Sequence, residues 1–313
     1  VPFPEARPAN RVDELVLAKL RELGIPPSEP CTDQVFIRRV HLDVIGMLPA
    51  ADEVRAFLAG ADPEKRRQLI DRLLERVEFA DYWALKWGDL LRIKAEFPSN
   101  LWPNAAQAYH RWVRDSLKGN MPYDRFAREL VTSSGSNFRN PPVNFYRAFQ
   151  KRDPQDLAEA AALLFLGARI GCARCHGHPV ESWTLDDNLG LAAFFAKVGY
   201  KNTQEWKEEI VFFKAKGGLR HPATGKPVAP AVPGGSAIAL GPEEDPRVRF
   251  AAWLTAPDNE VLVAMRTNPP SALLGSPSFQ TDGKFDPSKY QQALANPGNN
   301  WAPFEEILRR QLP

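Results

Sequence analysis

The amino-acid sequence predicts a mainly α protein with a small β-hairpin excursion and a loop-rich C-terminal region. Apolar residues recur at the spacing of an amphipathic helix from about residue 10 to residue 200. The chain has 29 prolines among 313 residues, and most of them flank these periodic stretches. Proline at a helix boundary restricts the backbone without unfolding it, so we expect many short helices joined by rigid connections.

Predicted helices cover most of the first 200 residues. They begin where a capping residue or a proline sets the first turn, as at Asn10 and at Asp62-Pro63, and Gly24 ends the first of them. The predicted ranges are 10–23, 32–48, 62–74, 79–93, 105–118, 122–131, 153–166 and 186–195. Asp186 and Asp187 occupy the first turn of the last helix, where acids interact with the helix dipole, so we expect them to be structural rather than catalytic.

The pattern changes after residue 200. Ile210–Phe213 is a short β-type run, and the glycine-containing segments 216–218 and 223–226 carry turn signals, which together predict a hairpin. Residues 227–246 are rich in proline and glycine and are expected to form a linker, followed by helices at 247–254, 259–265 and 304–311. We therefore predict a helical domain at 1–200, a hairpin and linker at 201–244, and a short helical region at 245–313.

Charge and hydropathy narrow the classes of partner. The chain has 40 basic and 38 acidic residues, a net charge of +2, which gives no overall field for binding nucleic acid. The longest apolar run, Ala160–Leu166, is far shorter than the roughly 20 residues that cross a bilayer, so no transmembrane segment is expected.

One motif carries clear chemistry: Cys172-Ala173-Arg174-Cys175-His176. Cys-x-x-Cys-His is the attachment site of a c-type haem, in which two thiols add across two vinyl groups and the histidine ligates the iron. Three cysteines and five histidines in the whole chain would produce this motif by chance on the order of once in a thousand sequences. The motif predicts a multi-helix domain built around one covalent haem c.

Three other interpretations of the motif are open: a zinc site, a redox-active or structural disulfide, and a plain packed loop. Structural zinc sites draw on two separated ligand pairs, whereas the other Cys and His residues of this chain occur singly. A redox Cys-x-x-Cys normally begins a helix after a strand, and here a helix precedes the motif. If both motif thiols form thioethers, only Cys31 remains, and no intramolecular disulfide is possible.

The motif also predicts where the protein works. Attachment of haem c takes place outside the cytoplasm, and a chain that starts at Val1 fits a processed N-terminus. We therefore expect a periplasmic or extracellular protein.

The second axial ligand of the iron is harder to predict. His178 follows His176 too closely to reach the opposite face, so we expect it to bind a backbone group or a propionate, or to lie at a docking surface. The Nδ1–H of His176 should reach a backbone carbonyl between Gly177 and Pro179. His110 is the favoured distal ligand, which makes His176 and His110 the predicted iron ligands. The other candidates are Met121, His41, His221, Met47 and Met265, and an open site is a further alternative.

Four stretches carry a resemblance to a known family: residues 36–46, 121–126, 172–179 and 183–195. They resemble the planctomycete-type cytochrome c-like domain of unknown function over roughly residues 10–200. Residues 245–259 resemble the start of the second domain that usually follows it, here in shortened form. The resemblance implies an exported, mostly helical haem-binding protein. With the motif, it gives the predicted haem-contacting set Cys172, Cys175, His176, His178, Pro179 and Trp183.

The predicted function is that of a monohaem c-type cytochrome that transfers electrons outside the cytoplasm to redox protein partners. A chain this large around one haem favours a fixed subunit of a larger, membrane-associated complex. Two alternatives are a haem enzyme with an open distal site, in which His178, His41 or His110 is the acid or base, and a structural subunit in which haem only staples the helices. No catalytic residue is assigned.

Overall fold

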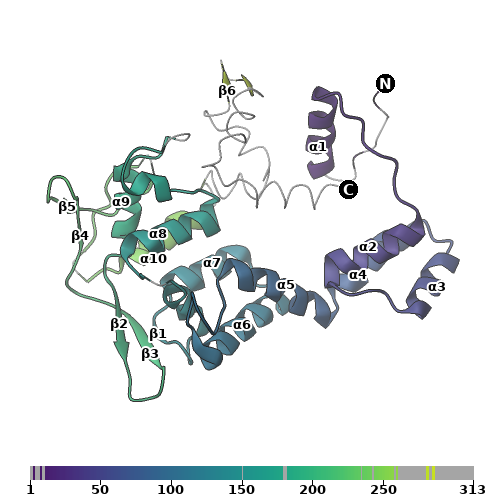
Figure 1. Ribbon diagram of the computed structural model, residues 1–313. Coiled ribbons are helices and arrows are strands. Elements are labelled where there is room, and N and C mark those ends of the chain that lie inside the picture. The colour runs from purple at the N-terminus through teal and green to yellow at the C-terminus, as the bar shows by residue number, and fades with distance from the viewer. Residues whose placement is uncertain are drawn as a thin grey trace. The chain divides into compact units, whose positions relative to one another are not determined.

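The computed structural model describes residues 11–149, 151–178, 182–233, 235–241 and 243–256, together with Phe3, Pro8, Asn259 and the strand residues 280–281 and 284–285. In this part of the chain the protein is mainly helical with a small antiparallel sheet, as predicted (Figure 1). The chain divides into two compact units. The first unit contains Val1–Arg39, Pro49–Arg66 and Ala264–Pro313, and the second contains Val40–Leu48 and Arg67–Val263.

The first unit holds α1 (Arg11–Glu22), the start of α2 (Asp33–Ile45) and α3 (Ala51–Ala59). Asp33 binds the first residues of α4 (Lys65–Leu74): its carboxylate accepts from Arg66 Nε at 2.8 Å and lies 2.7 Å from Lys65 Nζ. The rings of Phe36 and Phe57 stack with centroids 6.0 Å apart. Polar and aromatic contacts therefore hold α2, α3 and the start of α4 together.

Helix α3 was not predicted from the sequence. It spans only nine residues and begins after Ala50, which has no side chain that can cap a helix. Glu53 caps the helix instead, since its carboxylate accepts the Ala50 N–H at 2.8 Å. An acidic residue three positions inside the helix was the signal available in the sequence.

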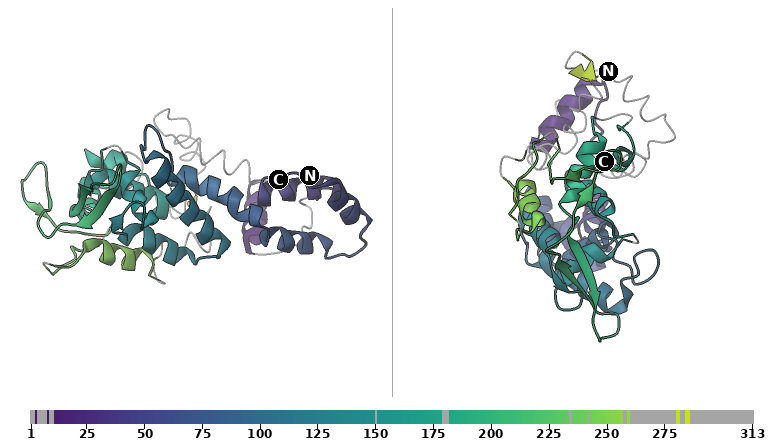
Figure 2. Two further views of the ribbon diagram at one scale, coloured as in Figure 1. Left: turned by 90° about the horizontal axis from the view of Figure 1, so that it is seen from below. Right: turned by 90° about the vertical axis from the view of Figure 1, so that its left-hand side faces the viewer.

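The helices of the second unit follow the predicted order. They are α5 (Val77–Leu90), α6 (Trp102–Lys118), α7 (Tyr123–Thr132), α8 (Pro154–Ala161), α9 (Leu185–Ala193) and α10 (Pro246–Leu254). Shorter pieces join them: the 3₁₀ helix η1 (Pro141–Arg147), the π-helical turn η2 (Ala162–Leu166) and the 3₁₀ turn η3 (Gly171–Arg174). Helices α5 and α6 pack on each other, α8 packs on α9, and α10 packs on α7 (Figure 2). None of the described helices is long and apolar enough to cross a membrane.

A single hydrophobic core joins these helices. Tyr109, Leu130, Phe165 and Phe194 have no exposed surface, and Phe250 of α10 is 1 % exposed. Each such side chain contributes roughly 1.5–3 kcal/mol by leaving water. Elements far apart in sequence, from α5 to α10, are thereby fixed against one another.

The predicted β run is confirmed as strand β3 (Glu209–Phe213), but its partner differs from the prediction. It pairs with β2 (Val198–Asn202) on one side and β1 (Gly135–Ser136) on the other, both antiparallel. Gly199, which follows the predicted helix at 186–195, pairs with Phe212 in the ladder. A Cβ on Gly199 would lie 2.8 Å from the Phe212 ring, so the strand requires glycine there.

The downstream turn signals form a second hairpin. Strands β4 (Leu219–Arg220) and β5 (Pro227–Val228) pair across the turn that contains Gly225. Strands β6 (Gln280–Thr281) and β7 (Lys284–Phe285) form a separate antiparallel pair.

The segment predicted as a linker packs on α9. Ala231 donates its N–H to the carbonyl of Gly190 at 3.2 Å, and a Cβ on Gly190 would lie 3.0 Å from Ala231 Cβ. The backbone approaches α9 this closely because residue 190 lacks a side chain. The predicted helices at 259–265 and 304–311 lie outside the described residues apart from Asn259, and the predicted domain boundaries stay predictions.

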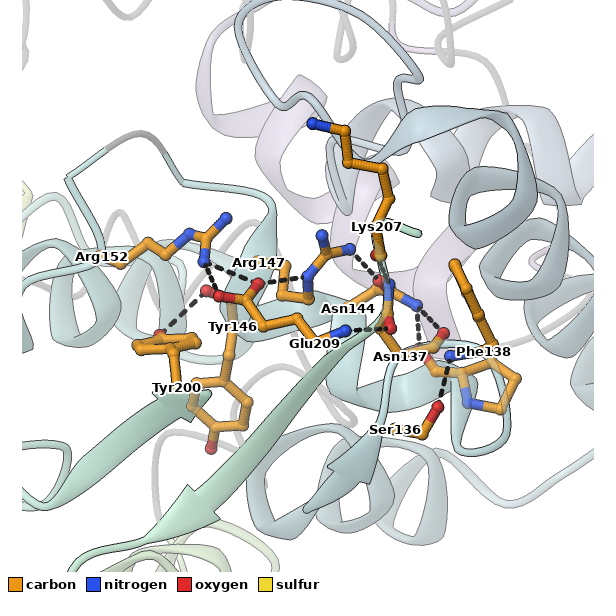
Figure 3. A network of polar contacts seen from close by, with 11 residues as sticks. Ser136, Asn137, Phe138, Asn144, Tyr146, Arg147, Arg152, Tyr200, Lys207 and Glu209 are labelled. Atoms are coloured by element: carbon orange, nitrogen blue, oxygen red, sulfur yellow. Dashed lines mark hydrogen bonds and ion pairs between the residues drawn. The ribbon is translucent and has the colours of Figure 1, made fainter. Parts of the chain in front are cut away.

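A buried polar network ties the sheet to η1 (Figure 3). Arg147 Nε donates to Glu209 at 2.7 Å, and Arg152 Nη1 donates to both oxygens of the same carboxylate at 2.9 Å. Asn144 bridges Arg147 to the carbonyl of Asn137, with bonds of 3.0 and 2.8 Å. The Glu209 N–H donates to the Asn137 side chain at 2.9 Å. Because each member has several partners, the network fixes the base of the β2–β3 hairpin.

Candidate functional site

The Cys172–His176 motif forms a single exposed turn. Residues Gly171–Arg174 make the 3₁₀ turn η3, closed by a hydrogen bond from the Ala173 N–H to the Ile170 carbonyl at 3.0 Å. Ala173 has no exposed surface, whereas Cys172 and Cys175 are exposed free thiols. The buried alanine anchors the turn and leaves both sulfur atoms accessible.

His176 follows the turn and is exposed. Its Nδ1 lies 2.7 Å from the carbonyl oxygen of Gly177. A carbonyl only accepts, so Nδ1 carries the proton in this contact and Nε2 keeps the lone pair that can bind a metal. The predicted hydrogen bond from Nδ1 to a nearby carbonyl is confirmed.

The other predicted haem contacts lie just beyond. His178 is half-buried and donates its backbone N–H to the carbonyl of Trp183 at 2.8 Å, which brings the two residues together. Pro179 lies outside the described residues.

Arg174 attaches the turn to the start of α8. Its guanidinium contacts Asp153 and Asp156, each at 2.7 Å, and lies 3.6 Å from Glu159. Asp153 is also the N-cap of α8, where it accepts the Asp156 N–H at 2.9 Å. The sequence analysis missed this contact set. The feature of the sequence that could have predicted these contacts is the three-residue spacing of Asp153, Asp156 and Glu159, which places the three carboxylates on one face of a helix.

The carboxyl groups around Arg174 differ in their acidity. Burial raises the pKa of Asp153, but hydrogen bonds from the Asp156 N–H and from Arg174 outweigh it and lower the pKa below its ordinary value. Burial raises the pKa of Glu159, and the Arg174 charge only partly opposes that effect. Asp153 is therefore an anion when it binds Arg174. Glu159 lies beneath Gly171 and is protonated more readily than an exposed glutamate.

Helix α9 supports the turn from the other side. Asn188 is fully buried, donates to the Ile170 carbonyl at 3.2 Å and accepts from Gln155 at 2.8 Å. Thr184 and Asp187 form a capping box at the start of α9, which confirms the structural role predicted for Asp187. The motif is thus fixed between the first turns of two helices.

The favoured distal ligand, His110, lies on α6. It is half-buried and lines a cavity of about 610 Å³ with Arg111, Arg114 and Asp115. No residue of the Cys172–His178 segment lines that cavity. The structure therefore does not bring His110 and the motif into one cavity, and the role of His110 stays a prediction.

The remaining distal candidates are dispersed. His41 is fully buried in α2, Met121 packs against the core after α6, and Met47 is 49 % exposed. His221 accepts the N–H of Ala223 through Nδ1 at 3.2 Å, and Met265 lies outside the described residues. Across the described residues, no three His, Cys, Asp or Glu side chains gather closely enough to hold a metal ion by themselves.

Comparison with known proteins gives one finding. A family model, PSCyt2, described as a protein of unknown function (DUF1549), matches residues 11–200. Neither a curated protein nor a solved structure gives a significant match. The match covers more than half of the 313 residues and includes the whole motif turn and both helices that hold it. The chain therefore belongs to the PSCyt2 family, a planctomycete-type cytochrome-like family whose function is unknown.

Proposed function

We propose that this protein is a monohaem c-type cytochrome that transfers electrons outside the cytoplasm. The observation that supports the proposal is the motif turn, where two exposed thiols precede an exposed imidazole with its Nδ1–H bound to the Gly177 carbonyl. These donors fit a haem held by two thioethers and one nitrogen ligand.

Each residue of the turn has a distinct role in the proposal. Cys172 and Cys175 would hold the haem, each by adding across one vinyl group: the sulfur would bond to one carbon and the thiol hydrogen would go to the other, with no net oxidation. His176 would ligate the iron through Nε2, and its hydrogen bond to Gly177 would fix the ring and increase its basicity. The bound haem supplies one-electron chemistry at its iron.

The rest of the site keeps the motif in place and accessible. Arg174 and Asn188 hold the turn from α8 and α9, while the thiols and the imidazole stay at the surface. A surface haem suits the small interfaces through which redox proteins exchange electrons. The proposal includes a redox protein partner, membership of a larger complex, and a periplasmic or extracellular location, since haem c is attached there.

Covalent haem is the first test. The full chain would be exported in a bacterial host that carries the c-type maturation machinery, then denatured, separated by electrophoresis and stained for haem. We expect one haem per wild-type chain, and none in Cys172→Ala/Cys175→Ala. Cys31→Ala is the matched control, because Cys31 lies outside the motif, and it should keep its haem. Absence of covalent haem from the wild type would reject the proposal.

The ligands of the iron form a second test. His176→Ala should keep both thioethers but lose the low-spin spectrum of the wild type. A reduced wild-type protein that does not bind carbon monoxide would support electron transfer. Rapid binding of carbon monoxide would instead favour a haem enzyme with an open site.

A further inference from the structure

The second unit contains a cavity of about 450 Å³ that is separate from the motif. It lies between the segment that leads into α6 and the connection from β2 to β3, and no residue of the motif turn lines it. Its apolar lining consists largely of four aromatic side chains, Phe97, Trp102, Phe138 and Trp206. A volume of this size is within the range of small-ligand sites.

Three of these rings are unusually accessible for aromatic side chains. Phe97 is 75 % exposed, Trp206 is 67 % exposed, and Trp102 is 37 % exposed. The two indoles meet edge to face, with centroids 5.4 Å apart and planes at 65°. Isolated exposed apolar residues are ordinary, but clustered aromatic rings around a cavity indicate a binding surface.

The first wall of the cavity is held firmly by the core. Leu101 has no exposed surface and Ser99 is 3 % exposed, so both residues anchor the segment. The Trp102 N–H donates to the Ala95 carbonyl at 3.0 Å. Trp102 adopts a left-handed backbone with φ of 67°, a conformation that a bulky residue rarely takes. Strain of this kind persists at positions that function requires and the surrounding fold enforces.

The second wall is held by the polar residues below the β2–β3 hairpin. Glu208 is buried and binds the hydroxyls of Ser136 and Thr203. Asn137 donates to the carbonyl of Lys207 at 3.3 Å, while the Lys207 side chain extends away from the network (Figure 3). The same loop carries Trp206, so both walls present their rings from fixed backbone.

The polar groups of the cavity are mixed and balanced in charge. They are one carboxylate, Glu96, one ammonium, Lys207, and two amides, Asn100 and Asn104. Lys207 Nζ lies 4.2 Å from the centre of the Trp102 ring, within cation–π range. The site therefore offers hydrogen-bond donors and acceptors beside aromatic faces, without a net charge.

This combination selects a class of ligand. The one carboxylate, Glu96, and the one ammonium, Lys207, balance, so the lining has no net Coulombic preference for a cationic or an anionic ligand. A wholly apolar ligand would remove the carboxylate and the amides from water without replacing their hydrogen bonds, which is unfavourable. A neutral sugar ring has an apolar C–H face that packs on an indole and a rim of hydroxyls that both donate and accept.

We propose that this cavity binds a neutral oligosaccharide, with Trp206 and Trp102 as stacking platforms and Glu96, Asn100, Asn104 and Lys207 as hydrogen-bonding groups. The site does not involve haem, so a test of oligosaccharide binding is independent of any test of the proposed electron transfer. Binding at this cavity would attach the protein to a glycan in the compartment where the protein functions.

Calorimetric titration of the full chain tests the proposal. The probes are neutral hexasaccharides of β-1,4-glucan, β-1,3-glucan, α-1,4-glucan, mannan and xylan, with polygalacturonate as the acidic comparison. We expect at least one neutral probe to bind, and Trp206→Ala to weaken that binding about tenfold or more. Trp206→Phe, which keeps an aromatic face, should weaken it by only about threefold.

Leu85→Ala is the matched control. Leu85 lies on α5, is 63 % exposed, and does not line the cavity, so this variant should bind like the wild type. Circular dichroism of each variant verifies folding, which the high exposure of Trp206 should preserve. The proposal is overturned if no neutral probe binds, if polygalacturonate binds more tightly than every neutral probe, or if Trp206→Ala and Trp102→Ala together leave the affinity unchanged.

Discussion

Arg174 shows how one side chain can position a whole motif. It lies between Ala173, which is buried, and Cys175, which is exposed, and it directs its guanidinium back to Asp153 and Asp156. The fork of an arginine can bind two carboxylates at once, which a lysine ammonium cannot do with the same geometry. One residue of the motif, Arg174, therefore attaches the motif turn to the rest of the fold.

Removing this attachment should destabilise the second unit. We expect Arg174→Ala to lower the free energy of unfolding by about 1–2 kcal/mol, a value reduced from that of a buried pair because the guanidinium is 29 % exposed. Arg174→Lys should lower the free energy of unfolding by a smaller amount. Urea unfolding measures both. Arg125→Ala is the control, since the Arg125–Glu129 pair lies on the surface of α7 and should contribute less than about 0.5 kcal/mol. Equal losses in Arg174→Ala and Arg125→Ala would contradict the proposed attachment.

Glu208 predicts a dependence of stability on pH. Hydrogen bonds from Ser136 and Thr203 lower the pKa of its carboxyl below the ordinary value of 4.5. The folded state therefore favours the ionised form, so this contribution is complete above about pH 4.5 and is lost as the pH falls through the lowered pKa. Between about pH 6 and pH 3, the wild type should lose more thermal stability than Glu208→Gln, which has no carboxyl to protonate. Parallel pH profiles for the two proteins would refute this assignment.

Among the elements, the helices were the most predictable from sequence and the sheet the least. Asp62 and Asp153 lie at helix starts because capping chemistry is local, and α8 begins at Pro154, within one residue of the predicted start at 153. Strand pairing depends on contacts between distant residues. Strand β2 contains a glycine and is short, so nothing in its own sequence identified it as the partner of β3.

In the candidate site, too, local contacts could be predicted from the sequence and contacts between distant residues could not. The thiols, His176 and its bond to Gly177 were predictable, because they lie within six consecutive residues. The contacts of Arg174 with α8 and of Asn188 with Ile170 join residues 15 or more positions apart. The aromatic cavity combines side chains from three separate segments, and its rings are individually indistinguishable from core residues in the sequence.

The antiparallel β2–β3 pair makes a testable prediction at the scale of the element. Gly199→Ala should destabilise the second unit by about 1–3 kcal/mol, because the added methyl group would meet the Phe212 ring at 2.8 Å and Lys214 at 2.9 Å. Gly218→Ala is the matched control, since a Cβ there meets no atom within 4 Å. Thermal unfolding measures both variants. A Gly218→Ala loss as large as that of Gly199→Ala would show that the ladder does not require glycine at 199.

At the scale of the whole molecule, the core of the second unit is built without the motif. Its described members extend from Ala84 to Leu254 and include none of Cys172, Cys175 and His176. Helix packing in this unit therefore depends on apolar contacts among the elements from α5 to α10 rather than on the motif turn.

The double variant Cys172→Ala/Cys175→Ala should consequently remain folded. We expect its helical circular dichroism to match that of wild-type protein without haem, and its melting temperature to lie within about 4 °C of that protein, a shift that corresponds to less than about 1–2 kcal/mol for a unit of this size. If the haem-free wild type and this variant both lose the helical structure of the haem-loaded wild type, while Cys31→Ala keeps it, the alternative in which haem staples the helices is favoured.

The buried Ala173 between two exposed thiols has a consequence for the order of events in the cell. In the proposed cytochrome, a chain that folds before haem arrives would keep both sulfur atoms within reach of a maturation enzyme, so attachment could follow folding. Outside the cytoplasm, however, two thiols separated by two residues can also oxidise to a disulfide. Under the proposed function, haem attachment and oxidation would then compete for the same folded precursor, and a reductant that keeps the pair reduced would set the fraction that matures.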